Sequence, residues 1–180
     1  MDVLLASIGL LMLSPLLLVV IGLIKIESKG PAFFKQERVG RYGEPFTMFK
    51  FRSMHCDAEA KRAELEMKRD PRITRVGAII RKTSIDELPQ LLNVLSGEMS
   101  LVGPRPPLPS EVAQYSRVDR ARLGATPGIT CLWQVAGRSD IPFDKQVKLD
   151  VRYIEKQSIW LDFIVLLKTI PAVIKARGAY

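Results

Sequence analysis

Histidine and cysteine are scarce in this chain of 180 residues, which contains one histidine, His55, and two distant cysteines, Cys56 and Cys131. Neither a zinc site nor a histidine-based catalytic triad can be built from so few of these residues. We expect His55 to have a structural role and both cysteines to be reduced thiols, as in a cytoplasmic compartment.

Acidic residues are also fewer than basic ones. The 27 lysines and arginines outnumber the 19 aspartates and glutamates, which gives a formal charge of +8. Such a balance suits an anionic membrane surface, a phosphorylated substrate or a nucleic acid. No known nucleic-acid-binding motif is present, so we expect no nucleic-acid partner. The length is typical of one domain with its own hydrophobic core.

Charge is absent from Val3 to Ile24, and this is the longest apolar run. As a helix it would extend roughly 33 Å, which is enough to cross the hydrocarbon of a bilayer. No basic segment precedes it and no small-residue cleavage site follows it, which argues against a cleaved signal peptide. Lys25 and Lys29 follow the run, and basic flanks of this kind stay on the cytoplasmic side.

Ser14 and Pro15 interrupt the middle of this apolar run. Proline lacks a backbone N–H and clashes with the carbonyl four residues earlier, here that of Leu11. One alternative is a membrane-spanning helix with a proline kink. The other is a re-entrant helix that bends at Ser14-Pro15 and leaves the membrane on the side where it entered. Hydropathy alone favours the spanning helix.

Periodic patterns elsewhere predict a mostly α protein with one small irregular β-hairpin. The hairpin covers Ala32–Arg52, which is the only strand-like region. Helices are expected at residues 57–70, around 76–80, and at 86–97, 110–123, 143–154 and 159–176. The last helix carries an apolar stripe that faces either the core or a membrane interface; the stripe consists of Trp160, Phe163, Ile164, Leu167, Ile170 and Ile174.

An adjacent acid pair, Asp86 and Glu87, lies near a predicted helix start within the segment Arg81–Pro106. Ser84 and Glu87 fit a capping box, in which both acids would only serve the helix start. Arg105, between two prolines, ends the same segment. A carboxylate pair close to a rigidly presented guanidinium also suits chemistry on a metal-bound phosphate.

Several motifs together resemble one family. The segments GPAFFKQERVG, FKFRSM, DPRITRVG, DELPQLLNVLSGEMSLVGPRP, TPGIT and LWQVAGR follow one another along nearly the whole chain. This pattern is similar to that of the bacterial sugar transferases, the monotopic polyprenyl-phosphate phosphoglycosyl transferases. The resemblance implies a re-entrant membrane helix at residues 1–25 that breaks at Ser14 and Pro15. It implies a catalytic domain at residues 26–180, with interfacial amphipathic helices, on the cytoplasmic face of a bacterial inner membrane.

The resemblance also implies an activity. A phosphosugar would pass from a UDP-sugar to polyprenyl phosphate (undecaprenyl phosphate) with release of UMP, as the first membrane step of polysaccharide or glycoconjugate assembly. Asp86 would be the nucleophile that forms a covalent phosphosugar intermediate, and Glu87 would assist it. Both acids would bind Mg²⁺, and the substrate phosphates would contact a set of basic residues, namely Lys50, Arg52, Arg81, Arg105 and Arg138.

Two other functions remain compatible with the residues alone. One is a membrane-tethered basic module that binds nucleic acid, and the other is a structural membrane scaffold. Nucleoside monophosphate release with a sugar nucleotide would distinguish the enzyme from both. The sequence identifies neither the sugar nor the polyprenol length, and it is compatible with a homo-oligomer.

Overall fold

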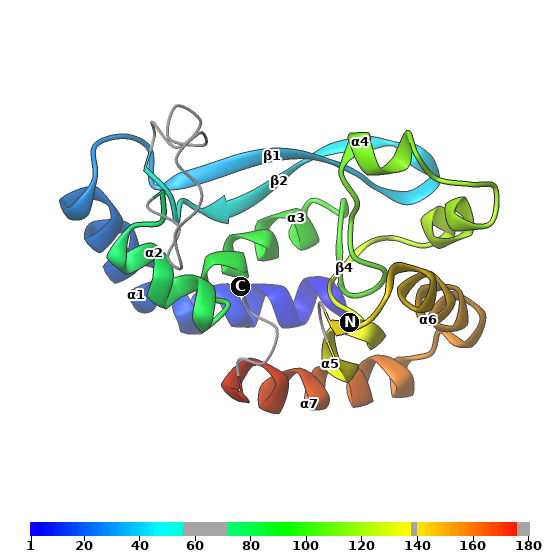
Figure 1. Cartoon of the computed structure of the whole chain (residues 1–180). Helices are drawn as coiled ribbons and strands as arrows, with labels where there is room; N and C mark the ends of the chain where they lie inside the picture. Colours follow the sequence, from blue (N-terminus) through cyan, green and yellow to red (C-terminus); the bar gives the residue numbers. More distant parts are fainter. Residues whose placement is uncertain (56–71, 138–139, 176–180) are drawn as a thin grey trace.

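The computed structural model describes residues 1–55, 72–137 and 140–175, and this part of the chain is mostly helical, as predicted (Figure 1). The predicted helix at 57–70 lies outside the described residues, as does Arg138. The α-helices are α1 (Asp2–Glu27), α2 (Arg75–Lys82), α3 (Leu91–Leu95), α4 (Pro109–Val112), α5 (Leu132–Ala136), α6 (Phe143–Lys156) and α7 (Ile159–Lys175). Short 3-10 segments are η1 (Arg41–Gly43), η3 (Ile85–Gln90) and η4 (Asp119–Gly124).

The predicted hairpin is confirmed. Strands β1 (Phe33–Val39) and β2 (Pro45–Phe51) pair antiparallel, and η1 forms the turn between them. Tyr42 in this turn has a positive φ of 59°, an unusual conformation for a residue other than glycine. The hairpin lies above α3 in Figure 1 and presents one face to the rest of the domain.

A second strand pair was not predicted. Strands β3 (Ser100–Val102) and β4 (Gly128–Thr130) pair in parallel. Each has three residues, which is too short for the alternation that identifies a strand in a sequence. Gly103 and Gly128 make the pairing possible, because a Cβ atom at Gly128 would overlap the backbone of Gly103.

The predicted helix at 110–123 is wrong. Helix α4 ends at Val112, and the chain forms helical structure again only in η4. Between them the Asp119 carboxylate accepts hydrogen bonds from the backbone N–H and the hydroxyl of Ser116, at 2.9 and 2.6 Å. Local side-chain bonds of this kind compete with the hydrogen bonds of a continuous helix.

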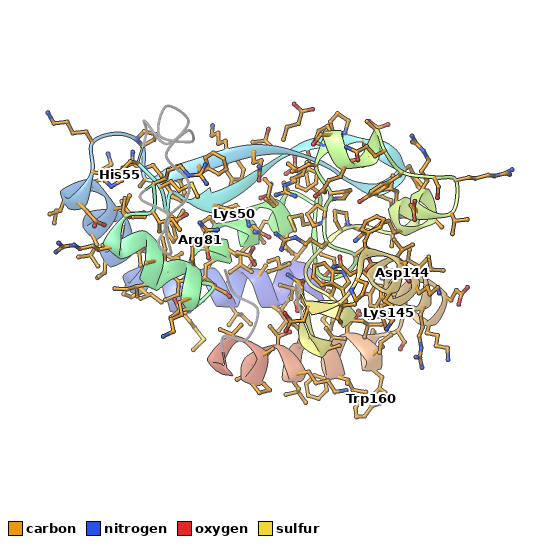
Figure 2. All side chains as sticks on the ribbon, viewed as in Figure 1. Lys50, His55, Arg81, Asp144, Lys145 and Trp160 are labelled. Atoms are coloured by element: carbon orange, nitrogen blue, oxygen red, sulfur yellow. The ribbon has the colours of Figure 1, made fainter. Side chains whose placement is uncertain are left out.

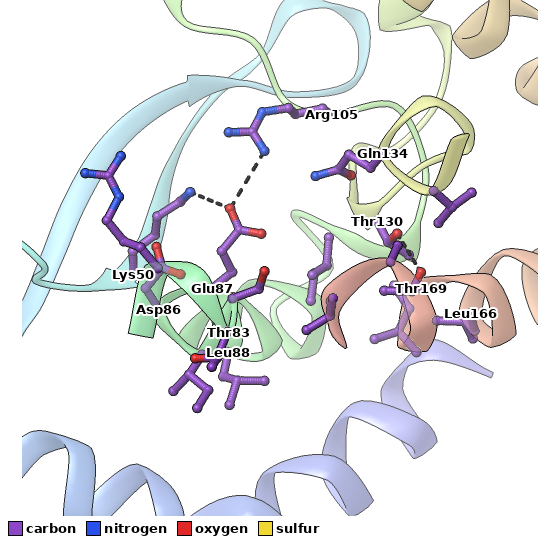
Figure 3. A pocket seen from close by; sticks show the side chains of 18 of the residues that line it. Lys50, Thr83, Asp86, Glu87, Leu88, Arg105, Thr130, Gln134, Leu166 and Thr169 are labelled. Atoms are coloured by element: carbon purple, nitrogen blue, oxygen red, sulfur yellow. Dashed lines mark hydrogen bonds and ion pairs between the residues drawn. The ribbon is translucent and has the colours of Figure 1, made fainter. Parts of the chain in front are cut away.

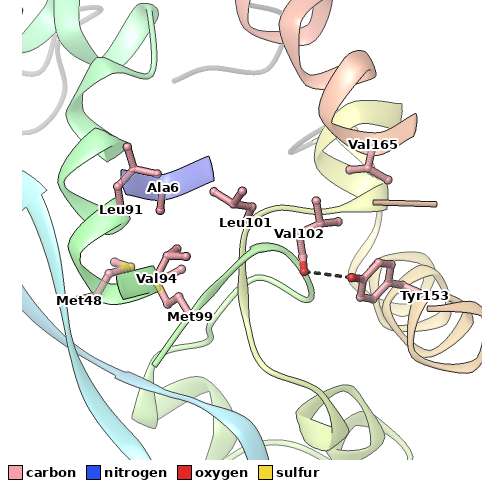
Figure 4. Packing of buried hydrophobic residues seen from close by; sticks show 9 residues of the cluster. All are labelled: Ala6, Met48, Leu91, Val94, Met99, Leu101, Val102, Tyr153 and Val165. Atoms are coloured by element: carbon pink, nitrogen blue, oxygen red, sulfur yellow. Dashed lines mark hydrogen bonds between the residues drawn. The ribbon is translucent and has the colours of Figure 1, made fainter. Parts of the chain in front are cut away.

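Two apolar clusters hold α1 against the rest of the domain. Ala6 belongs to the larger cluster, which Figure 4 shows with Met48, Leu91, Val94, Met99, Leu101, Val102, Tyr153 and Val165. Val20 and Ile24 belong to the second, with Ala32, Phe51 and Ile80. Both halves of α1 are therefore packed on the same domain.

Polar contacts also fix both ends of α1. The Ser100 hydroxyl donates to Asp2 Oδ2 at 2.6 Å, and the Glu27 carboxylate accepts from the backbone N–H groups of Arg75 and Val76 at 2.7 and 2.9 Å. In the middle, the Ser14 hydroxyl donates to the Leu11 carbonyl at 2.8 Å. Pro15 has no N–H to donate to that carbonyl, so the Ser14 hydroxyl replaces the missing helical hydrogen bond.

Most of α1 nevertheless exposes apolar side chains. Its mean hydropathy reaches 2.7 over an 18-residue window of which 11% is buried, and by length and composition it could cross a membrane. The N-terminal helix is thus long and apolar, as predicted. An exposed apolar surface of this size is typical of contact with a membrane or another protein.

Helix α7 places its predicted stripe on the outside. Val165 and Leu161 pack on the core, whereas Trp160 is 70% exposed and Ile170 59% exposed. Figure 2 shows Trp160 projecting from α7 away from the body of the protein. The described members of the stripe therefore do not form a core-facing surface; Phe163 and Leu167 are also exposed.

Candidate active site

A left-handed residue presents the acid pair. Ser84, between α2 and η3, has φ 56° and ψ 17°, and it lies two residues before Asp86. Ser84 makes no side-chain cap and the Glu87 carboxylate accepts from Lys50 instead, so these two residues do not form the capping box that their spacing allows. The positive φ of Ser84 replaces the extended conformation that an N-cap residue usually adopts.

The Glu87 carboxylate lies between two cations from distant segments. Its Oε1 atom accepts a hydrogen bond from Lys50 Nζ on β2 at 2.7 Å and lies 3.7 Å from Arg105 Nη1 (Figure 3). The side chain of Arg105 is 36% exposed and those of Lys50 and Glu87 are 15% and 20% exposed. The cluster is therefore open to a ligand, although it is partly desolvated.

Backbone contacts on both sides hold the loop that carries Arg105. The Pro104 carbonyl accepts from the N–H of Gly128 at 2.9 Å, and the Pro106 carbonyl accepts from the buried Arg38 guanidinium at 3.0 Å. The two prolines also restrict φ. The sequence-based expectation of a rigidly presented guanidinium agrees with these contacts.

Asp86, like Glu87, is partly buried. Burial, and then repulsion from Glu87, raises its pKa from 3.8 to about 6, against the opposing effect of Lys50 and Arg81. At neutral pH roughly nine-tenths of such a group is ionised. Asp86 is therefore a carboxylate at physiological pH, but its negative charge is less favourable than that of an exposed acid.

Both acids line a pocket of about 710 Å³ with two different ends. The charged end contains Lys50, Arg81, Asp86, Glu87 and Arg105. The other end, towards α5 and α7, contains uncharged polar groups and apolar side chains (Figure 3). Four of the five predicted phosphate-binding residues are described, and three of these line the pocket with the acid pair.

Arg52 is the exception. Its guanidinium donates to the carbonyls of Ser28 and Lys29, each at 2.8 Å, and the side chain does not contribute to the pocket lining. The family resemblance had placed Arg52 with Lys50 among the phosphate-binding residues. Strand β2 ends at Phe51, so Arg52 is the first residue after the strand. Its contacts join the hairpin to the end of α1 and do not support a role in phosphate binding.

Sequence reasoning missed the uncharged polar part of the pocket, which consists of Thr83, Ser84, Thr130, Gln134, Gln146 and Thr169. Thr130 belongs to the unpredicted strand β4, and Gln134 belongs to α5, which was not among the predicted helices. Single uncharged side chains on separate elements give no spacing signal. Only the fold reveals that they share a cavity.

The acid pair is also the candidate for metal binding. Among the described residues there is no cluster of three or more histidine, cysteine, aspartate or glutamate side chains that could hold a metal ion. Mg²⁺ commonly uses one or two carboxylates together with substrate phosphate oxygens. Asp86 and Glu87 fit that requirement when a diphosphate supplies the other ligands.

Comparison with known proteins adds an independent observation. A family model described as "Bacterial sugar transferase" matches residues 1–176. The exopolysaccharide production protein ExoY of Rhizobium meliloti is 42% identical, over 99% of this chain and 86% of its own length. The UDP-glucose:undecaprenyl-phosphate glucose-1-phosphate transferase of Caulobacter vibrioides is 43% identical, over 100% of this chain and 70% of its own length.

Other relatives are longer. The undecaprenyl-phosphate galactose phosphotransferase of Salmonella typhimurium is 46% identical, over 84% of this chain but 35% of its own length. This chain therefore corresponds to most of some relatives and to about a third of others.

Proposed function

Because the chain belongs to the bacterial sugar transferase family, we propose that it transfers a sugar 1-phosphate from a UDP-sugar to undecaprenyl phosphate and releases UMP. Relatives are named for undecaprenyl-phosphate transfer of galactose and glucose phosphates. The observation that carries the proposal is the pocket in which Asp86 and Glu87 lie beside Lys50 and Arg105. A diphosphate needs several fixed cations and an accessible carboxylate, and this pocket offers both.

We propose that Asp86 is the nucleophile. Its carboxylate oxygen would bond to the sugar-bearing phosphorus, and the bond from that phosphorus to the bridging oxygen would break, with the electron pair leaving on UMP. A phosphate oxygen of undecaprenyl phosphate would then attack the same phosphorus and regenerate the carboxylate. Covalent catalysis by a carboxylate on phosphorus is established chemistry.

The cations would act on the charge of the reacting phosphate. Lys50 and Arg105 already neutralise Glu87, and each has further N–H donors for phosphate oxygens. Arg81 lines the same end of the pocket. Asp86 and Glu87 would hold Mg²⁺, which would further neutralise the diphosphate when bound.

The contacts of α1 support a same-side membrane topology. A straight helix of 26 residues would extend roughly 39 Å. A helix crossing the bilayer would leave Asp2 on the opposite side from the catalytic domain, yet Asp2 is bonded to Ser100 of that domain. We therefore infer that both ends of α1 lie at the cytoplasmic face of the bacterial inner membrane, with Ser14 and Pro15 at the deepest point.

The outward face of α7 supports the same placement. Its exposed apolar side chains, with Trp160 at one end, would lie in the membrane interface beside α1. The pocket borders α7 through Leu166 and Thr169. A lipid phosphate could then reach Asp86 without the isoprenoid leaving the bilayer.

A crosslink between two introduced cysteines tests the topology. The variant Asp2→Cys/Ser100→Cys, treated in intact membranes with a short bifunctional thiol reagent, should become internally crosslinked, because the two wild-type side chains are in contact. Each single-cysteine variant controls for reaction with Cys56 or Cys131. A double variant that stays uncrosslinked while remaining active would contradict the same-side topology.

The activity is tested by a screen of UDP-sugars with undecaprenyl phosphate in lipid nanodiscs. At least one UDP-sugar should yield UMP and a lipid-linked phosphosugar. Release of UMP with none of them would favour a structural membrane scaffold, and salt-dependent binding of random duplex DNA would favour a nucleic-acid-binding module.

A further inference from the structure

Four uncharged polar side chains converge at the end of the pocket that the proposed chemistry does not use. Thr130 comes from β4, Gln134 from α5, Gln146 from α6 and Thr169 from α7. We refer to these four as the neutral patch. Figure 3 shows Thr130, Gln134 and Thr169 on the opposite side of the pocket from Lys50 and Asp86. Four separate elements thus contribute polar groups to a wall that is otherwise apolar.

The hydrogen bonds within the patch determine what it offers a ligand. The Thr169 hydroxyl donates to the Val165 carbonyl at 2.8 Å, as expected for a threonine within a helix. The 2.8 Å contact between the Thr130 and Thr169 hydroxyls must then be donated by Thr130. Both hydroxyl hydrogens are used inside the protein, so each oxygen presents only lone pairs to the pocket.

Gln134 strengthens this conclusion. Its Oε1 atom is buried and has no hydrogen-bond partner within the described parts of the chain. Gln146 is partly fixed, because its amide nitrogen donates to the Ile141 carbonyl at 2.8 Å. Buried polar atoms are nearly always hydrogen-bonded, and Gln134 lines the pocket, so we expect a ligand in the pocket to supply the donor for this oxygen.

We propose that the neutral patch binds the hydroxyl groups of the transferred sugar and so sets sugar selectivity. This inference rests on the proposed function. Uncharged acceptors do not attract phosphates, which the cations at the other end of the pocket would bind under the proposed function. The sugar is bonded directly to the phosphate that Asp86 would attack, so it must occupy the space next to the charged end. Sugar hydroxyls donate hydrogen bonds to amide and hydroxyl oxygens.

The uracil ring of the donor also has an N–H group, so the test must separate the two halves of the substrate. The variant Gln134→Leu keeps side-chain size and removes both amide groups. The measurements are kcat/KM for UMP release from UDP-glucose and UDP-galactose, which differ in configuration at one hydroxyl, and competitive inhibition by UDP, which lacks the transferred sugar. Gln114→Leu, at an exposed position outside the pocket, is the matched control.

In Gln134→Leu, kcat/KM for the preferred sugar should fall about tenfold or more, because a site built to bond a hydroxyl loses discrimination when its partner is removed. The ratio of kcat/KM between the two sugars should change about fivefold or more, whereas inhibition by UDP should stay within about twofold of wild type. Gln114→Leu should change none of these values.

Three results would overturn or redirect the inference. An unchanged sugar ratio in active Gln134→Leu would show that the neutral patch does not bind the sugar. A parallel loss of UDP inhibition would assign the patch to the uridine. Absence of UMP release by wild type with every UDP-sugar would instead overturn the proposed function.

A second variant covers the case in which Gln134→Leu does not fold. Thr169→Val is nearly isosteric and removes one hydroxyl of the patch without introducing a charge. It should shift the same sugar ratio in a protein that keeps its melting temperature within a few degrees. An unchanged ratio in folded Thr169→Val would overturn the assignment of Thr169 to the sugar site.

Discussion

Two regions of this protein place a carboxylate beside an arginine, and they differ in what surrounds the pair. In the pocket, Glu87 contacts Lys50 and Arg105, with Asp86 next to it. In the interior, Asp150 on α6 lies 2.5 Å from Arg122 in η4. Burial raises the pKa of Asp86 and that of Asp150, although nearby cations oppose the shift in both regions.

The surroundings of the interior pair make it a structural element. Asp150 is fully buried and Arg122 is 4% exposed. The guanidinium also bonds the Tyr115 hydroxyl at 3.1 Å and lies against the rings of Tyr115 and Phe143. One acid and one base are matched there, and neither lines the pocket.

The pocket region has a surplus of cations and an open cavity. Lys50, Arg81 and Arg105 face two acids, and a ligand with negative charge can complete the balance. The comparison teaches that a perturbed pKa does not by itself identify a functional site. Access and an unbalanced charge distinguish the site from a buried ion pair.

The largest expected effect is on catalysis, and it tests the pocket side of the comparison. Asp86→Asn keeps the size of the side chain but removes the attacking charge, so turnover should fall about 10³-fold or more, as for loss of other nucleophiles. Wild type with UDP-sugar alone should release up to one UMP per site and gain a phosphosugar on Asp86, detectable by mass spectrometry. Asp86→Asn should do neither.

Direct transfer in a ternary complex is the competing mechanism. It predicts intersecting double-reciprocal lines, whereas a covalent intermediate predicts parallel lines. An active wild type that gives no UMP burst and no adduct, with its preferred sugar, would refute the role of Asp86 as nucleophile.

The interior pair should respond in stability. Asp150→Asn leaves Arg122 buried without a counter-charge, and the free energy of unfolding should fall by about 3–5 kcal/mol. The molecules that remain folded should release UMP with a nearly normal KM. Urea unfolding and steady-state kinetics on the same preparation measure both. A stable Asp150→Asn protein with lost turnover would place Asp150 in the catalytic machinery and break the distinction drawn above.

Removal of one pocket cation should have a smaller effect. Arg105→Ala should lower kcat/KM about tenfold or more, since one charge-assisted hydrogen bond contributes roughly 1.5–3 kcal/mol. Arg117→Ala, at an exposed position outside the pocket, is the control and should stay near wild type. Equal small effects at both positions would exclude Arg105 from the site.

The pH dependence of the rate should follow Asp86. The attacking form is the carboxylate and its pKa is raised to about 6, so kcat/KM for the UDP-sugar should fall towards tenfold per pH unit below that value. The free energy of unfolding should depend on the ionisation of Asp86 in the opposite direction to the rate. The raised pKa favours the folded state below about pH 3.8, and this contribution is lost as pH rises through 6. A flat rate profile from pH 5 to 7 would contradict Asp86 as the titrating group.

Much of the fold could be predicted from the sequence, and the reason can be named for each element. The hairpin, α6 and the glycine after α3 follow from alternation, helical periodicity and the need for a positive φ, which is 81° at Gly97. The proximity of Lys50 to Glu87 and Arg105 could not be derived from spacing, because Lys50 is far from the other two residues in the chain. The expectation that they share a site came from the family resemblance. Arg52 came from the same resemblance, and its contacts with the carbonyls of Ser28 and Lys29 connect the hairpin to the end of α1.

Strands β3 and β4 were not predicted, because what allows them to pair is the close approach of the backbone at Gly103 and Gly128. A sequence pattern does not reveal such a contact. The neutral patch depends on that strand pair and on the packing of α7. Both features are therefore properties of tertiary structure, and no local pattern in this sequence predicts them.

The smallest expected effect concerns the backbone that presents Asp86. Ser84 has a positive φ of 56°, a conformation that costs a residue other than glycine of the order of 1–3 kcal/mol. Ser84→Gly removes this strain, but the flexible unfolded chain offsets part of the gain, so the melting temperature should rise by a few degrees at most. Turnover should stay within about threefold, because glycine adopts the same turn. Ser84→Val should lower both stability and turnover, since a β-branched residue tolerates this conformation poorly. A normal rate in Ser84→Val would mean that the left-handed turn is not needed to position Asp86, and that the pocket side of the comparison depends on its charges alone.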